Sequence, residues 1–179
     1  MVCVKKAVIK DPKTLSELVS ALVTLGYRIG VTIGSWDLLH IGHVRYLIEA
    51  KKRCDILIVG VDTDRAIKLY KGPLRPVVPE GERCEMLTYQ ECVDFVVPVD
   101  DVDEKGAWQY DLLKIVKPDV FIAVVGSYPP EQLEDIKGYC KELVVLPRQA
   151  EETSTSDMIQ NTLKRHLDLL YGIVQKGRG

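Results

Sequence analysis

Two histidines flank a glycine in the run His40-Ile41-Gly42-His43, three residues after Asp37. A neutral imidazole donates one hydrogen bond and a protonated one donates two, so each ring could hold a phosphate oxygen. Glycine has no Cβ that would block the close approach of an anion. The alternatives are a helix start without chemistry, or half of a metal site. A metal site is the weaker alternative, because the chain has only one other histidine, His166, and no Cys-x-x-Cys pair.

The residues around this motif predict a strand, a turn and a helix. Val31–Ile33 is a short β-rich run that is followed by Gly34. After the motif, Val44, Leu47 and Ile48 recur with helical spacing. A strand, a glycine turn and a helix together present a helix N-terminus, whose free N–H groups and positive dipole end suit phosphate. We therefore expect a phosphate site at this turn.

The string from Gly34 to His43, G-S-W-D-L-L-H-I-G-H, resembles the signature G-x-[FW]-D-x-x-H-x-G-H of the HxGH nucleotidyltransferases, the cytidylyltransferase-like superfamily. The resemblance extends over roughly Ile29–Ile159. It implies that His40 and His43 donate to the α- and β-phosphate oxygens of a nucleoside triphosphate. It also implies that the other residues of the signature bind the nucleotide. These are Gly34, Ser35, Trp36, Asp37 and Gly42.

A basic stretch, Thr63–Arg75, follows the second expected strand. On its own it would be interpreted as a solvated basic loop. However, Lys71-Gly72 and the following R-P-V-V-P-E-G-E-R resemble the K-G-x-x-R-P-V-x-P-x-x-x-R run of ADP-heptose synthase nucleotidyltransferase domains. The resemblance implies that Lys71 contacts the α-phosphate region and that Arg83 helps to bind the nucleotide phosphates.

The stretch Leu146–Ile159, L-P-R-Q-A-E-E-T-S-T-S-D-M-I, resembles the R-T-x-G-[IV]-S-T-[ST]-x-[IL] run of glycerol-3-phosphate, phosphocholine and phosphoethanolamine cytidylyltransferases. The resemblance implies an arginine beside the nucleotide, with hydroxyl groups and a helix start at the terminal phosphates. Arg148, Ser154, Thr155 and Ser156 would fill these roles. The chain has one residue more than the pattern between the arginine and the serine. A plain capped helix is the alternative.

Two further stretches bear on the substrates. In Phe121–Tyr128 the family commonly has glycine-aspartate near the base, whereas this chain has Gly126-Ser127. Backbone contacts from Gly126 could survive this change, but a carboxylate contact could not. Asp101, Asp103 and Glu104 form an acidic cluster after the third strand, which we interpret as a solvated face, with a metal or amino-group site as the alternative.

Apolar runs and helical patterns alternate along the chain. Runs of strand length occur at Asp55–Asp62, Val93–Val99, Asp119–Gly126 and Glu142–Pro147, in addition to Val31–Ile33. Helical patterns occur at Pro79–Gln90, Gly106–Lys117 and Pro129–Cys140. This order predicts an α/β fold, a doubly wound five-stranded parallel sheet of Rossmann-like type with its ligand beyond the carboxyl ends of the strands.

We expect a single nucleotidyltransferase domain over residues 1–179. Its two ends are expected to be an N-terminal helical extension, 1–27, and a C-terminal helix, 154–176. The first helix would begin at Asp11-Pro12 and end at Gly26. It would pack on the sheet or form a dimer contact, and packing is the simpler interpretation.

Composition limits the classes of function. The 179 residues are 46% hydrophobic and 28% charged with a net charge of −2, which gives no general attraction to nucleic acid or membrane. There is no apolar run of membrane-spanning length and no apolar core of signal-peptide length. The odd number of cysteines without motif spacing favours a reduced, cytoplasmic protein. They are Cys3, Cys54, Cys84, Cys92 and Cys140.

Together, these motifs imply transfer of a nucleotidyl group from CTP or ATP to a phosphorylated sugar or alcohol, with release of pyrophosphate. Mg²⁺ would be bound mainly through the triphosphate. The S-T-S-D run favours cytidylyl transfer, whereas the Lys71–Arg83 run favours adenylyl transfer that forms an ADP-sugar. Together they slightly favour CTP as the donor. A nucleotide-binding regulatory protein without turnover is the alternative from another class.

The resemblance also implies a homodimer whose contact lies near the nucleotide site. Trp36, Tyr46 and Tyr70 lie in or beside the motifs, and aromatic residues are enriched at protein interfaces. The alternative is that these rings pack inside the monomer or against the acceptor.

Overall fold

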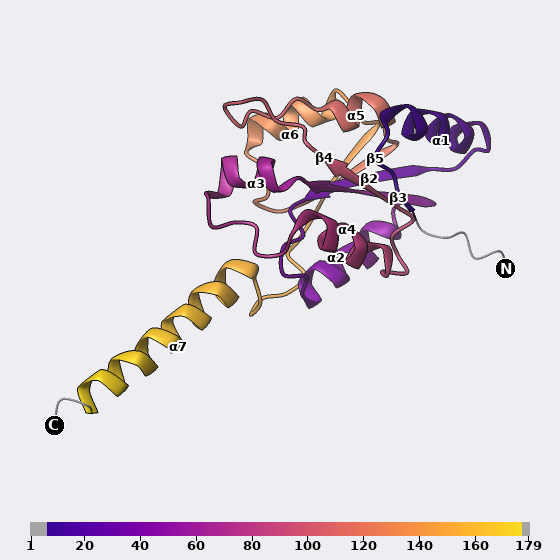
Figure 1. Cartoon of the computed structure of the whole chain (residues 1–179). Coiled ribbons are helices and arrows are strands. Elements are labelled where there is room, and N and C mark those ends of the chain that lie inside the picture. Colours follow the sequence, from indigo (N-terminus) through magenta and orange to yellow (C-terminus); the bar gives the residue numbers. More distant parts are fainter. Residues whose placement is uncertain (1–6, 177–179) are drawn as a thin grey trace.

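A computed structural model describes residues 7–176, apart from the side chains of 172 and 174–176. Its centre is a parallel sheet in the order β1-β4-β3-β2-β5-β6 (Figure 1). The strands are β1 Ala7–Val8, β2 Ile29–Gly34, β3 Ile56–Asp62, β4 Phe95–Val99, β5 Val120–Val124 and β6 Glu142–Leu146. The predicted α/β class and doubly wound parallel sheet are confirmed.

The sheet has six strands where the sequence predicted five. The additional strand, β1, pairs with the edge of β4 through Ala7 and Val8. Two residues are too few to show a strand periodicity, so the sequence pattern did not reveal it. The segment expected as a helical extension, 1–27, therefore contributes a strand to the sheet as well as a helix.

The helices are α1 Pro12–Thr24, α2 Ile41–Lys51, α3 Asp64–Lys71, α4 Glu80–Thr88, α5 Asp111–Val116, α6 Pro130–Lys137 and α7 Thr155–Lys176. Two of them differ from expectation. The stretch expected as a basic loop contains α3, which Thr63 caps by accepting a hydrogen bond from the Ala66 amide. The helix expected from Gly106 begins only at α5, because Gly106 and Tyr110 both have left-handed backbone angles that interrupt it.

Each face of the sheet carries its own apolar core, because successive strand residues point to opposite faces. Ile58 of β3 faces α1, α5 and α6, where Leu15 and Leu113 are buried. Its neighbours Leu57 and Val59 face α2 and α4. Figure 1 shows these two helical layers, with α7 projecting away from the body. Helix α1 packs on the sheet, which confirms the simpler of the two interpretations of this segment.

The two halves of the sheet separate at their carboxyl ends. The chain winds from β2 through β3 to β4, and then returns to the other side of β2 with β5 and β6. Strands β2 and β3 pair over six residues, whereas β2 and β5 pair only at Gly30–Val120 and Val31–Phe121. Beyond these pairs the strands diverge and leave a crevice at the topological switch point, where doubly wound folds bind their ligands.

Gly60 lies in the centre of β3, where there is no space for a side chain. A Cβ there would come within 2.8 Å of Ile33 and 3.0 Å of Leu112, so Gly60→Ala should lower the free energy of unfolding by about 1–3 kcal/mol. Gly81→Ala is the control: its Cβ would meet nothing within 4 Å, and alanine favours helix α4 by up to about 1 kcal/mol. Urea unfolding measures both variants, and equal stabilities would contradict the packing of β3.

Candidate active site

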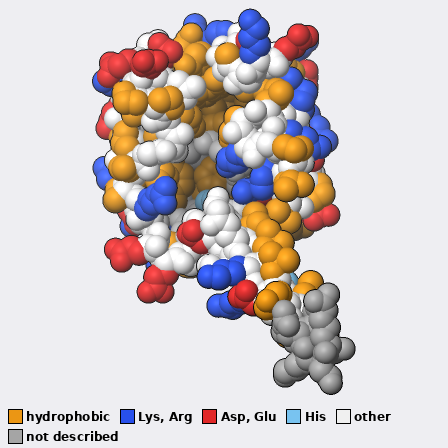
Figure 2. Space-filling model, turned by 90° about the vertical axis from the view of Figure 1, so that its left-hand side faces the viewer, with side chains coloured by type: hydrophobic (Ala, Val, Ile, Leu, Met, Phe, Trp, Pro, Cys, Tyr) orange, Lys and Arg blue, Asp and Glu red, His pale blue; other side chains and the backbone are white. Residues whose placement is uncertain are grey.

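A cavity of about 640 Å³ opens at the carboxyl ends of the central strands, within the usual size range of small-molecule sites. Figure 2 shows the molecule hollowed on this side, with Lys and Arg side chains around the opening. Most of the residues expected at the nucleotide site line this cavity. They are Gly34, Ser35, Trp36, His40, Gly42, His43, Lys71, Gly126, Arg148, Ser154 and Thr155. Asp37, Arg83 and Ser156 are not among its lining residues.

His40 is the N-cap of α2. Its Nδ1 accepts a hydrogen bond from the Gly42 amide at 3.1 Å, so the hydrogen of the neutral ring is on Nε2, where it can be donated to a ligand. Gly42 is needed for this cap, because a Cβ there would come within 2.9 Å of the His40 ring and 3.0 Å of Ala150. The glycine thus makes room for the imidazole and the distant chain segment at Ala150.

The His43 ring stacks on that of His40, with the two centroids 3.9 Å apart, and makes an edge-to-face contact with Trp36. Burial, with smaller contributions from His40 and Lys71, lowers the pKa of His43 to about 4. The ring is therefore neutral at pH 7. Its buried Nδ1 has no hydrogen-bond partner among the described residues, so no protein group there fixes the tautomer. The ring is available to donate one hydrogen bond to a ligand.

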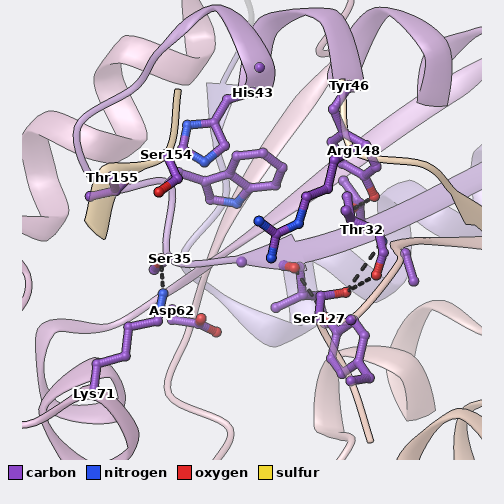
Figure 3. A pocket seen from close by; sticks show the side chains of 18 of the residues that line it. Thr32, Ser35, His43, Tyr46, Asp62, Lys71, Ser127, Arg148, Ser154 and Thr155 are labelled. Carbon is purple, nitrogen blue, oxygen red and sulfur yellow. Dashed lines mark hydrogen bonds between the residues drawn. The ribbon is translucent and has the colours of Figure 1, made fainter. Parts of the chain in front are cut away.

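Lys71, at the C-terminal end of α3, donates from Nζ to Ser35 Oγ at 2.7 Å (Figure 3). Burial, followed by the nearby Arg75, lowers the pKa of Lys71. In Figure 3 the guanidinium of Arg148 reaches into the cavity between His43 and Ser127. The basic loop expected from the sequence is thus a helix end that brings its lysine to the histidines.

Asp37 is buried and binds protein groups. Its carboxylate accepts hydrogen bonds from Arg75 Nε at 2.7 Å and from the amides of Val77 and Val78. Burial alone would raise the pKa of Asp37, but these donors together hold it below its ordinary value. Its carbonyl oxygen accepts from Thr155 Oγ1. Asp37 therefore fixes the loop between β2 and α2.

Arg83 is 2% exposed, and the protein binds most of its guanidinium. Nε donates to the Val78 carbonyl, one terminal nitrogen donates to the carbonyls of Ser35 and Asp62, and the other pairs with Asp64 at 2.7 Å. The expectation that Arg83 contacts the nucleotide phosphates is not supported by this geometry. Its hydrogen bonds instead hold the ends of β2 and β3 together.

The start of α7 lies at the cavity. Ser154 Oγ accepts a hydrogen bond from the Asp157 amide at 3.1 Å and so caps this helix, while Thr155 Oγ1 donates to the Asp37 carbonyl. Ser156 is exposed and does not line the cavity. Two of the three expected hydroxyl residues thus lie where an anion could reach them.

Ser127 closes the turn after β5. Its Oγ donates to the Val124 carbonyl at 2.6 Å and accepts from the Val124 amide. Gly126 has a φ of +78°, which a residue with a side chain rarely adopts. The departure from the family pattern therefore has a structural use, and the turn offers its backbone to the cavity.

The sequence interpretation missed Asp62 and Trp108 at the opposite side of the cavity. It considered Tyr70, which also lines this side, as a dimer contact, with packing inside the monomer or against the acceptor as the alternative. It was also wrong about Asp101, which is 4% exposed and accepts a hydrogen bond from Trp108 Nε1, so it is not part of a solvated face. Strands β3 and β4 end at Asp62 and Val99. Polar residues at or just after such strand ends were the sequence signal that could have located this side of the cavity.

Two of the aromatic residues considered for a dimer contact are inside the monomer. Trp36 is 6% exposed and donates from Nε1 to the Gly60 carbonyl. Tyr46 is 5% exposed and donates to the Ile122 carbonyl, while Thr32 shares a hydrogen bond with its hydroxyl. The interpretation of these two rings as interface surface is therefore wrong. Both rings belong to the apolar core on one face of the sheet.

Two absences apply to residues 7–176. This part of the chain holds no group of three or more His, Cys, Asp or Glu side chains that could bind a metal ion. None of its helices combines the length and apolar character needed to cross a membrane.

Asp37→Asn should lower the free energy of unfolding by about 3 kcal/mol, because one oxygen of a buried carboxylate becomes an NH₂ group that faces donors. The pKa of Asp37 is lowered in the folded state, so its stabilisation is present above the unfolded value and is lost as the pH falls through the folded value. Glu134→Gln, in an exposed pair with Lys137, is the control and should cost less than about 0.5 kcal/mol. Similar losses for both variants would contradict the role of Asp37.

NMR titration of the imidazoles should show His43 neutral down to about pH 5, with a midpoint near 4. Inorganic tripolyphosphate should raise that midpoint, because an anion stabilises the charged ring. A midpoint near the ordinary value of about 6.5 would contradict the buried, neutral state of His43.

Comparison with known proteins identifies the family of this chain. Residues 31–162 match the cytidylyltransferase-like family. The chain is 31% identical over 163 residues to bifunctional protein HldE of Trichlorobacter lovleyi, covering 89% of this chain and 32% of that protein. It is 41% identical over 114 residues to HldE of a Nitratiruptor species, covering 64% of this chain and 24% of that protein.

The chain thus spans about a third or less of the length of these curated relatives. A solved structure, the lipopolysaccharide core biosynthesis protein from Thermoplasma volcanium, aligns with a TM-score of 0.60 and 25% identity. That alignment covers 70% of this chain and all of that protein. The resemblance inferred from the HxGH motif is confirmed, and the chain belongs to the cytidylyltransferase-like family of nucleotidyltransferases.

Proposed function

We propose that this protein transfers a nucleotidyl group from ATP or CTP to a phosphorylated sugar and releases pyrophosphate. The observation that supports this proposal best is the pair of stacked imidazoles at the start of α2, with Lys71 across the same cavity. Donors held in place before the reaction are what charge development on phosphorus oxygens requires.

The proposed step is a displacement at the α-phosphorus. A phosphate oxygen of the acceptor forms a bond to this phosphorus while the bond to the β-phosphate bridging oxygen breaks. Pyrophosphate leaves with the electron pair of that bond, and no proton transfer is needed. His40 Nε2–H and His43 would donate to phosphate oxygens, and Lys71 would neutralise the α-phosphate. The protein thus contributes position and charge without forming a covalent intermediate.

The nucleotide is assigned to the side of the cavity formed by β5, β6 and α7. Arg148 reaches into this side, and Ser154 and Thr155 stand at a helix start that suits terminal phosphates. Mg²⁺ prefers oxygen ligands and is commonly held by one or two carboxylates together with substrate phosphates. The described residues contain no larger ligand cluster, so the triphosphate would supply most of its ligands. When bound, the ion neutralises phosphate charge.

A sugar phosphate is the proposed acceptor class. The Lys71–Arg83 run resembles ADP-heptose synthase domains, and one structural relative is described as a lipopolysaccharide core biosynthesis protein. The S-T-S-D run resembles cytidylyltransferases, so both ATP and CTP are candidate donors. A regulatory protein that binds nucleotide without turnover is the competing function. Loss of the family aspartate at Ser127 is the observation that favours it.

Pyrophosphate release, measured with a panel of triphosphates and sugar phosphates, tests the proposal. His43→Ala should lower turnover by about a hundredfold or more, the scale for losing one donor to developing charge. Lys71→Ala should impair catalysis or triphosphate binding much more than Lys52→Ala, because Lys52 is outside the cavity and pairs with Glu49. Nucleotide binding without pyrophosphate release from any acceptor would favour the regulatory function.

We further propose that the protein is a homodimer. Helix α7 leaves the body of the molecule and carries an exposed apolar row, Leu163, Leu167 and Leu170 (Figure 1). Residues at this spacing lie on one face of a helix. Because two of the aromatic candidates are buried, α7 becomes the proposed contact, and a two-fold dimer is the commonest soluble arrangement.

Light scattering at micromolar concentration should give twice the chain mass of 20.1 kDa. Leu167→Glu should shift the mass towards the monomer, because a charge would enter the apolar row. Asn161→Glu adds the same charge to the opposite face of α7 and should leave the dimer intact. A monomer in the unmodified protein would refute the dimer, and equal effects of the two variants would refute the contact on α7.

A further inference from the structure

The cavity has an acidic side that the transfer step does not use. It lies at the carboxyl ends of β3 and β4, whereas the nucleotide side lies at β5 and β6. Strand β2 lies between the two sides, and His40 and His43 follow it in the chain. Asp62, Tyr70, Asp101 and Trp108 line it. Since the nucleotide is assigned to the β5 and β6 side, the second substrate has this side available.

Asp101 is the residue there with an unmet hydrogen-bonding need. Its Oδ2 accepts from Trp108 Nε1 at 2.9 Å and from the Leu112 amide at 3.3 Å. Its Oδ1 is buried and has no hydrogen-bond partner among the described residues. Burial raises the pKa of Asp101, as expected for a carboxylate with too few donors. A buried carboxylate oxygen without a partner requires a hydrogen-bond donor from outside the protein, such as a ligand or a water molecule.

Asp62 is a second carboxylate at this side, and Figure 3 shows it near Lys71. One of its oxygens accepts from the hydroxyl of Tyr70, and burial raises its pKa, with Asp101 adding to the rise. Two carboxylates disfavour a phosphate group beside them, whereas Lys71 favours one. These charges would therefore orient an acceptor with its phosphate group at Lys71 and its hydroxyl groups at the two carboxylates.

A quaternary ammonium group is a poorer fit to this side than hydroxyl groups. Recognition of quaternary ammonium uses open aromatic faces. Here the Trp108 ring packs against Tyr110 at 4.4 Å and Tyr128 at 5.6 Å between centroids, so the protein itself uses much of this aromatic surface. The polar groups that this side offers to a ligand are carboxylate and phenol oxygens, which pair well with the hydroxyl groups of a sugar.

Resting on the proposed function, we infer that Asp101 and Asp62 select a polyhydroxylated sugar phosphate as the acceptor by accepting hydrogen bonds from its hydroxyl groups. Trp108 acts through Asp101 as a positioning residue, because its Nε1–H fixes one carboxylate oxygen and leaves the other for the sugar. An acceptor such as phosphocholine, whose quaternary ammonium has no N–H or O–H group to donate, leaves these carboxylates without hydrogen-bond donors and binds less well.

The test compares the KM for the acceptor with the KM for the nucleotide. Asp101→Asn should raise the acceptor KM for glucose 1-phosphate and mannose 1-phosphate, or whichever aldose phosphate is turned over, by tenfold or more. The nucleotide KM should stay within about twofold. Trp108→Phe should shift the same parameter less. Glu104→Gln, an exposed residue of the same segment, is the matched control and should change neither KM.

Calorimetric titration with aldose phosphates, glycerol 3-phosphate, phosphoethanolamine and phosphocholine separates this inference from the proposed function, because binding needs no turnover. If no acceptor is turned over, the proposed function fails, and weaker aldose phosphate binding by Asp101→Asn would still support the inference. Preference for phosphocholine or phosphoethanolamine would overturn it. Equal effects of Asp101→Asn on the acceptor KM and the nucleotide KM would also overturn it. So would no effect of Asp101→Asn, which would indicate that only water donates to the buried oxygen.

Discussion

Two buried charged side chains, Asp37 and Arg83, determine the shape of the loop on which the rest of the site depends. This loop joins β2 to α2, and Trp36 and Leu38 on either side of Asp37 have φ values of +52° and +47°. Such left-handed angles cost roughly 1–3 kcal/mol each in residues with side chains. The donors to the Asp37 carboxylate and the carbonyls bound by Arg83 hold the loop in this form. Asp37 and Arg83 thus position the loop, whereas other residues, the two histidines and Lys71, are the ones proposed to contact the phosphates.

The divergence of β2 and β5 is the second constraint, because it opens the crevice but exposes backbone groups in its walls. Side-chain hydroxyls satisfy some of them: Tyr46 donates to the Ile122 carbonyl and Tyr128 donates to the Ile33 carbonyl. The crevice therefore stays open without leaving these groups unpaired. The His40–His43 pair at the start of α2 lines the same cavity.

Local patterns predicted the parts of the fold and site that local chemistry determines. Apolar runs located β2 to β6, and the HxGH motif located the helix start, since each depends on neighbouring residues. The roles of Asp101 and Arg83 could not be derived in this way. Whether a charged residue is buried depends on distant segments: Asp101 is covered through Trp108, and Arg83 binds carbonyls at the ends of two other strands. The strand β1 was missed because its two residues gain their structure only from β4.

We propose that the α-phosphate of a nucleoside triphosphate lies between the two histidines and Lys71, while Arg83 binds the ends of β2 and β3 and does not contact the phosphates. A crystal structure with a non-hydrolysable triphosphate tests this most directly. We expect α-phosphate oxygens at about 3 Å from His40 Nε2, His43 and Lys71 Nζ, with Arg83 still bound to the carbonyls of Ser35 and Asp62. A triphosphate held by Arg83, or bound away from the start of α2, would contradict it.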